Sequence, residues 1–146
     1  MTTTRHWTIA VLLLAAACGE EGPTKYEDMD FDQRASFMNE VVLPEMRETF
    51  VGFDAKYASM TCATCHGSGA ADGTYAMPNP DLPRLPPTEE EFLEYVKDPE
   101  HGRWSQFMVD EVWPQMADLL AVPAFDPVKA PMGFSCSSCH MVEGQQ

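Results

Sequence analysis

Two short motifs in this 146-residue chain each bring two thiols and an imidazole together. They read Cys62-Ala-Thr-Cys65-His66 and Cys136-Ser-Ser-Cys139-His140. The spacing C-x-x-C-H is the attachment pattern of c-type haem, in which two thiols add to the vinyl groups and the next histidine reaches the iron. The sequence therefore predicts two covalently attached haem c groups. The four motif cysteines are the expected attachment residues, and the two motif histidines are the expected proximal iron ligands.

Paired cysteines also serve two other chemistries. Four thiolates can hold one zinc ion as a ribbon, and a C-x-x-C pair can work as a redox-active disulfide. The two pairs lie far apart in the chain and both carry the histidine. A thioredoxin-like site also needs a strand–helix–strand context, which the sequence does not indicate. These observations favour haem attachment and leave zinc and the disulfide as alternatives.

The number of histidines limits the choice of the second axial ligand. The chain has four histidines. His6 lies in the expected export signal, two are proximal ligands, and His101 is the one that remains. Two haems with two histidine ligands each therefore cannot be built within one chain. Thioether sulfur is the usual substitute, because Met/His ligation is a standard arrangement in cytochromes c.

We expect Met46 and Met116 to be the distal iron ligands. They occupy equivalent positions of an internal repeat and precede their motifs by 16 and 20 residues. Met38 and Met108, one or two helical turns earlier, are also equivalent and form the second choice. His101 has no counterpart in the repeat and stays open as a ligand that displaces one methionine.

The repeat includes the elements that must position these ligands. Residues 37–46 read FMNEVVLPEM and residues 107–116 read FMVDEVWPQM, at an offset of 70, while the two C-x-x-C-H motifs lie at an offset of 74. Apolar residues recur with helical spacing in both copies. The pattern predicts one helix over about 32–50 and a second around 104–119.

Local signals refine these two helices. Asp30 with Gln33 forms a capping box ahead of the first helix. Pro44 and Pro114 lie inside the helices, where a missing N–H and a ring clash should bend the axis. Such a bend could tilt the following turn, with its methionine, towards an iron.

The predicted fold class is mainly α, with two tandem helix–loop–C-x-x-C-H repeats, long irregular connections and little or no β-sheet. We place the first repeat at 31–87 and the second at 88–146. The stretch 67–87 is rich in Gly and Pro and is predicted to be an irregular loop over the first haem. Thr88 should open a short helix with a capping box, and Asp98-Pro99 should end it.

The first residues have the pattern of an export signal. Arg5 precedes an apolar run that ends in small residues just before Cys18, and this run is too short to span a bilayer. The pattern resembles a bacterial lipoprotein signal, which implies a signal peptide over 1–17, a lipid on Cys18 and a lipidated tether over 18–30. The expected location is the periplasmic side of the envelope. Gly19 in place of Asp favours the outer membrane. A plain secretory signal is the alternative.

The charge balance indicates the kind of partner. The formal net charge is −14, from 23 acidic and 9 basic residues. Such a surface disfavours nucleic acid, because phosphate is bound by basic residues. It favours redox proteins with a basic docking surface, whose encounter it would accelerate. Solubility alone is the simpler explanation of the charge.

A helix that carries a methionine, then a loop, then C-x-x-C-H, all in tandem, resembles the cytochrome c subunit of photosynthetic reaction centres. The resemblance covers roughly residues 34–66 and 104–140. It implies that each haem takes a distal methionine from the preceding helix, although one haem in that family takes a histidine. This chain has two haem motifs rather than the four of that subunit, so docking to a reaction centre does not follow.

The sequence thus predicts electron transfer through two closely spaced haems, whose irons are closed by His and Met. Two other functions stay open. A di-haem enzyme such as a peroxidase needs an openable iron with an acid–base group near it, and His101 is the neutral candidate. A haem sensor, or a haem subunit of a larger complex, is the third possibility.

Overall fold

The computed structural model describes residues 25–144. The expected signal peptide over 1–17, the lipidation site Cys18 and the first part of the tether lie outside these residues. The described part is mainly helical, and its only β-type pairings are isolated bridges. The predicted fold class is confirmed at this level, as a mainly α chain with no β-sheet in the described residues.

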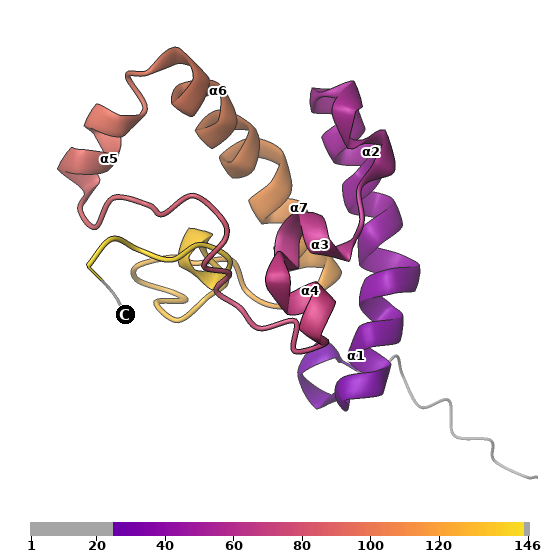
Figure 1. Ribbon diagram of the computed structural model, residues 1–146. Coiled ribbons are helices and arrows are strands. Elements are labelled where there is room, and N and C mark those ends of the chain that lie inside the picture. Colours follow the sequence, from indigo (N-terminus) through magenta and orange to yellow (C-terminus); the bar gives the residue numbers. More distant parts are fainter. Residues whose placement is uncertain (1–24, 145–146) are drawn as a thin grey trace, which may run out of the picture.

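The helical elements follow one another along the chain with short connections in the first half and longer ones in the second (Figure 1). They are η1 (Tyr26–Asp28), α1 (Phe31–Phe37), η2 (Met38–Val42), α2 (Leu43–Phe53), η3 (Ala55–Ser59), α3 (Cys62–His66), α4 (Ser68–Asp72), α5 (Glu89–Tyr95), α6 (Pro99–Phe107), η4 (Met108–Val112), α7 (Trp113–Leu119) and η5 (Cys136–Ser138). Elements η2 and η4 are π-helical, and η1, η3 and η5 are 3-10 turns.

Elements α1, η2 and α2 form one continuous helix, as Figure 1 shows. The predicted capping box begins it: Asp30 Oδ1 accepts from the Gln33 N–H and Gln33 Oε1 accepts from the Asp30 N–H, both at 2.9 Å. The break in α-helical pattern comes just before Pro44, which has no N–H to donate and whose ring crowds the preceding turn. The Leu43 N–H bonds the Met38 carbonyl, five residues back, so the turn widens.

The second half repeats this arrangement. Elements α6, η4 and α7 form a continuous helix in which the Trp113 N–H bonds the Met108 carbonyl, directly before Pro114. The Asp98 side chain caps the start of α6 by accepting from the Glu100 and His101 N–H groups at 2.9 and 3.0 Å. Helix, π turn and helix therefore recur at the same offset of 70 that the sequence repeat shows.

The π turn keeps an apolar row on one face. Met38, Val42, Met46 and Phe50 are spaced by four residues, and on a regular α-helix the first and third of these would diverge by about 80°. A π turn accommodates an extra residue, which reduces this divergence to roughly 20°. Val42, Met46 and Phe50 are all buried. The equivalent row of the second half is Met108, Val112, Met116 and Leu120.

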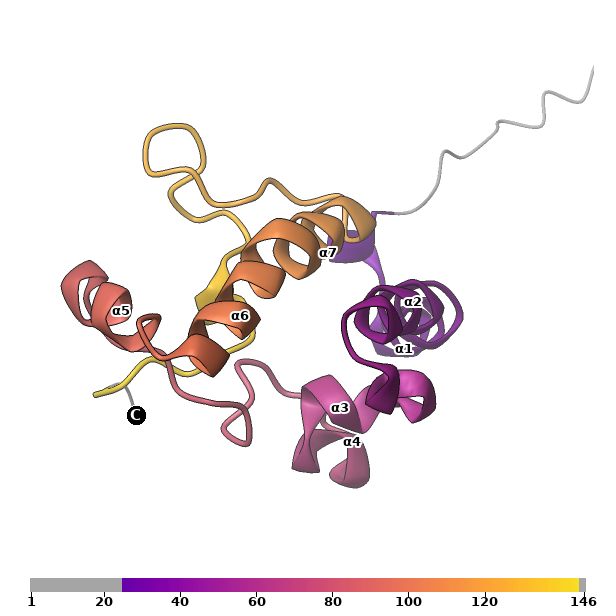
Figure 2. The same ribbon diagram turned by 90° about the horizontal axis from the view of Figure 1, so that it is seen from above.

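The two long helices pack against each other through aromatic side chains. The ring of Phe107 stacks on Phe53 at 4.0 Å between centroids and meets Phe50 edge-on at 5.1 Å. Thr49 also donates from Oγ1 to Gln115 Oε1 at 2.6 Å. Figure 2 shows α2 nearly end-on, with α6 and α7 passing beside it. The core is this contact region, formed by Val42, Met46, Phe50, Met60 and Phe107.

The stretch 67–87 is less irregular than predicted, because it contains α4. Beyond α4, it pairs with the C-terminal segment through isolated parallel bridges, Asn79 with His140 and Leu85 with Val142. Thr88 caps α5 as expected, accepting from the Glu91 N–H at 3.2 Å. Helix α5 ends at Tyr95, earlier than predicted, and Asp98-Pro99 begins α6 instead of ending α5.

Candidate functional site

The first motif forms its own short helix, α3. Thr61 and Thr64 make a capping box at its start, in which the Thr61 N–H donates to Thr64 Oγ1 at 3.2 Å. Cys62 and Cys65 are three residues apart on this helix, so their thiols lie on one face. The helix ends at His66. The next residue, Gly67, has a φ of 53°, and a Cβ there would come within 2.4 Å of an Asp81 carboxylate oxygen. Glycine is therefore required directly after His66.

The second motif has the same local design in different residues. Ser135 and Ser138 form its capping box, with the Ser135 N–H donating to Ser138 Oγ at 3.0 Å. Cys136 begins the 3-10 turn η5 and Cys139 follows it. Side chains three residues apart in a 3-10 turn eclipse each other, so these thiols also share a face. Both motifs can thus present two thiols to one flat ligand.

Each motif is tied to its long helix through an equivalent carbonyl group. Arg47 on α2 donates from Nε and Nη2 to the Met60 carbonyl oxygen at 3.1 and 2.7 Å. Trp113 on α7 donates from Nε1 to the Phe134 carbonyl oxygen at 2.6 Å. Met60 and Phe134 each stand two residues before the first cysteine of a motif. The helices that carry the candidate methionines are therefore joined to the motifs.

Both motif histidines are oriented by backbone carbonyl groups. His66 Nδ1 lies 3.1 Å from the Tyr75 carbonyl oxygen, and His140 Nδ1 lies 2.9 Å from the Pro83 carbonyl oxygen. A carbonyl oxygen can only accept, so Nδ1 carries the proton and the lone pair of the neutral ring is on Nε2. Burial lowers the pKa of His66, with the bond to Tyr75 opposing it, which favours the neutral ring. Nε2 is the nitrogen that can ligate iron.

The four motif cysteines are free thiols. Burial raises the pKa of Cys65 to about 11 and that of Cys139 to about 12, and in each case neighbouring cysteines add to the effect. Burial also raises the pKa of Cys136. Cysteines of redox-active C-x-x-C sites have a lowered pKa, because the thiolate is the attacking species. The raised pKa of Cys136, the first cysteine of its motif, is of the opposite kind.

The structure brings the two motifs together. The Asn79 N–H donates to the Cys139 carbonyl oxygen at 2.8 Å, and the Asn79 side-chain amide donates to the Cys65 carbonyl oxygen at 2.8 Å. Cys65 is close enough to Cys139 to raise the pKa of its thiol. Figure 1 shows the C-terminal segment, in yellow, beside the connection that follows α4. The two sites are therefore neighbours, although their sequences are 74 residues apart.

The methionines predicted as distal ligands differ in their surroundings. Met46 is 3 % exposed and belongs to the core cluster, against which Cys65 of the first motif also packs. Met116 is half-buried and packs against the same cluster. Met38 and Met108, the second choice, are half-buried as well and each begins a π turn.

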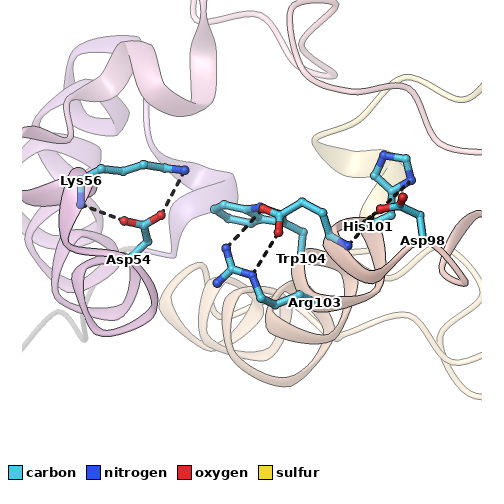
Figure 3. A network of polar contacts seen from close by, with 7 residues as sticks. Asp54, Lys56, Asp98, His101, Arg103 and Trp104 are labelled. Atoms are coloured by element: carbon cyan, nitrogen blue, oxygen red, sulfur yellow. Dashed lines mark hydrogen bonds and ion pairs between the residues drawn. The ribbon is translucent and has the colours of Figure 1, made fainter.

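His101 is held at the junction of α5 and α6. Its ring stacks on Tyr95 at 4.0 Å with an interplanar angle of 5°, and its Nδ1 lies 3.9 Å from Asp98 Oδ1. Figure 3 shows His101 and Asp98 close to Arg103 and Trp104. Trp104 Nε1 donates to Glu100 at 2.9 Å. The ring is about half exposed. These contacts give His101 a structural role at a helix start.

The donor chemistry of both motifs fits haem c. Each offers two thiols on one face and an imidazole whose Nε2 holds the lone pair. Within residues 25–144, no group of three or more His, Cys, Asp or Glu side chains is placed to hold a metal ion. A haem iron takes a single histidine together with a methionine sulfur, and so it does not require such a group.

Sequence reasoning missed the residues that link the parts of this site. They are Asn79, the helix-to-motif donors Arg47 and Trp113, and the carbonyl groups of Tyr75 and Pro83. The paired hydroxyl residues Thr61/Thr64 and Ser135/Ser138 could have been predicted from the sequence, because they repeat at the same offset of 74 as the motifs.

Comparison with protein-family models, with curated proteins and with solved structures gives no match for this chain. In the described part of the chain, no helix combines the length and apolar character needed to cross a membrane.

Proposed function

We propose that this chain is a di-haem cytochrome c that transfers electrons between redox partners. Haem c is attached through Cys62 and Cys65 in the first half and through Cys136 and Cys139 in the second. The protein works at the periplasmic side of a bacterial envelope, where a lipid on Cys18 anchors it, with the outer membrane favoured. It is a two-haem relative of the reaction-centre cytochrome subunit, built from two tandem haem-binding repeats.

The duplicated environment of the motif histidines carries this proposal. His66 and His140 each donate from Nδ1 to a backbone carbonyl oxygen, at 3.1 and 2.9 Å. The lone pair on Nε2 is therefore the one that can bind a metal. A metal-ligating histidine is generally oriented in this way through its other ring nitrogen. The same arrangement twice, each time next to two thiols on one face, is what two haem c sites require.

One methionine side chain would complete the coordination of each iron. Met46 and Met116 supply sulfur from the helices that Arg47 and Trp113 join to the motifs. Haem bound here supplies reversible one-electron chemistry at iron, and Met/His ligation raises its reduction potential. The chain's own part is to hold the cofactor, to fix the histidine rings and to exclude other ligands.

The size of the protein core supports a bound apolar cofactor. Within residues 25–144, seven apolar residues are buried. This number is small for the size of the chain, since chains of this length normally bury most of their surface on folding. Met132 is 95 % exposed and Val128 is 86 % exposed, both in the segment that leads to the second motif. Haem groups attached at the motifs would provide further apolar packing surface.

The experiment that tests the proposal counts haem in the mature protein. The pyridine assay should give two haems per chain, and optical and low-temperature EPR spectra should show two low-spin irons with a sulfur-to-iron charge-transfer band. The double variant Cys136→Ser/Cys139→Ser is the matched control and should retain one haem. No haem in the unaltered protein would defeat the proposal and return zinc or a disulfide to consideration. An iron that binds CO would favour the peroxidase or the sensor.

A further inference from the structure

One buried amide contacts both motifs at equivalent atoms. Asn79 is 1 % exposed, and among residues 25–144 it is the one polar residue that is buried. Its side-chain Nδ2 donates to the Cys65 carbonyl oxygen and its backbone N–H donates to the Cys139 carbonyl oxygen, both at 2.8 Å. Cys65 and Cys139 are the second cysteines of their motifs. A single residue therefore fixes the distance between two points that are equivalent in the repeat.

The Asn79 side chain is itself held in place. Its Oδ1 accepts from the Asp81 N–H at 2.8 Å. The Asp81 carboxylate in turn accepts from the N–H and the Oγ of Ser68, both at 2.7 Å. Ser68 follows the first motif after one glycine. Both the oxygen and the nitrogen of the amide group thus form hydrogen bonds. Through Asp81, this network also reaches Ser68, which lies just after the first motif.

The segment around Asn79 also orients both histidines. Tyr75, whose carbonyl bonds His66, lies four residues before Asn79, and Pro83, whose carbonyl bonds His140, lies four residues after it. The segment 75–83 therefore contacts each motif twice, once at a cysteine carbonyl and once at a histidine ring. A buried polar residue with all its bonds made specifies one arrangement, because any displacement leaves unpaired groups in an apolar environment.

We infer that segment 75–83 is the common base of both haem sites and that Asn79 is the positioning residue that sets one haem relative to the other. The inference rests on the proposed function. Displacement of Asn79 should alter the histidine orientation at both irons together, because the carbonyl groups of Tyr75 and Pro83 belong to the same segment. Reduction potentials respond to such changes in ligand orientation and hydrogen bonding.

The test compares a variant at the shared residue with variants confined to one motif. Asn79→Leu keeps the branching at Cγ, removes both side-chain bonds and leaves the backbone bond to Cys139 in place. Thr64→Val and Ser138→Ala each remove one capping bond, in the first and second motif respectively. Redox titration followed optically, together with low-temperature EPR, measures both irons in each variant. We expect Asn79→Leu to displace both midpoint potentials and to broaden both low-spin signals, and each single-motif variant to affect one haem.

The inference is overturned if Asn79→Leu changes one haem or neither. If that variant does not mature, Asn79→Ala decides, because it loses both side-chain bonds and adds no charge near the irons. It should again displace both potentials. Haem per chain in the unaltered protein separates the two claims. Fewer than two haems there defeats the proposed function, whereas two haems with unresponsive Asn79 variants defeats this inference alone.

Discussion

Replacing Met46 by leucine separates its two possible roles, as a core residue and as an iron ligand. The side chain is 3 % exposed and contributes to the core cluster. Leucine has nearly the same volume, so packing should lose less than about 1.5 kcal/mol. For a chain of this size the melting temperature should fall by no more than roughly 6 °C. Alanine is unsuitable, because a cavity at this position would cost about 2–5 kcal/mol by itself.

The loss of the sulfur atom has a much larger effect if Met46 ligates iron. One of two irons would lose its distal ligand, so the sulfur-to-iron band should fall to half its intensity and one low-spin signal should disappear. The midpoint potential of that haem should fall as well, because Met ligation raises it. Axial ligands as a class set haem potentials over about 0.8 V. The optical and EPR spectra of the oxidised protein measure the first two effects directly.

Met38→Leu is the matched control, since Met38 lies on the same helix and the same apolar row. It should leave both low-spin signals and the full band. The reasoning would be refuted if Met38→Leu halved the band and Met46→Leu did not, which would make Met38 the ligand. An unchanged band in both variants would remove this helix as a source of the ligand. The pair Met116→Leu and Met108→Leu applies the same test to the second haem.

Four further outcomes are expected. Phe107→Ala should lower the free energy of unfolding by about 3–5 kcal/mol, since this ring stacks between the two long helices. Phe37→Ala, at the equivalent and half-buried position, should lower it clearly less when both variants are measured by denaturant titration. Gly67→Ala should reduce haem incorporation at the first motif, because its Cβ would lie 2.4 Å from a carboxylate oxygen. Gly73→Ala is the control, because Gly73 is also at positive φ but has open space around it, and this variant should keep two haems in the pyridine assay. Backbone N–H donors lower the pKa of Asp98. The stability that the ionised Asp98 adds to the fold is therefore present above the ordinary carboxyl pKa and is lost as pH falls below about 4. The melting temperature of Asp98→Asn should fall less with pH in that range. Electron transfer to a basic partner protein should slow as salt is raised, while transfer to an acidic one should not, in stopped-flow measurements.

The parts of the fold that depend on neighbouring residues could be predicted from the sequence. The capping box of Asp30 with Gln33 is confirmed, and the two long helices include the predicted ranges, although the second begins earlier than predicted, at Pro99. Both depend on contacts within a few residues of one another. The prolines were expected to bend the helices, and the structure shows a π turn before each. The row of apolar residues spaced by four was the available signal, because a regular helix cannot keep such a row on one face.

The links between the motifs could not be predicted, for a physical reason. Asn79 bonds residues that are 14 positions before it and 60 positions after it. Such contacts depend on how the chain folds back, and a single buried asparagine has no periodic pattern. The helix-to-motif donors are also hidden, since Arg47 and Trp113 differ in residue type and in position within the repeat. The coordination by Met46 and Met116 remains a prediction.

The carbonyl that orients His140 belongs to Pro83, which lies in the stretch 31–87 that we placed in the first repeat. The two halves are therefore unequal in what they need from each other. A fragment that ends at residue 87 keeps the Tyr75 carbonyl group that orients His66. A fragment that begins at residue 88 has no partner for the second imidazole. The orientation of the second motif histidine therefore depends on a segment that precedes α5, whereas the orientation of the first depends on Tyr75 alone.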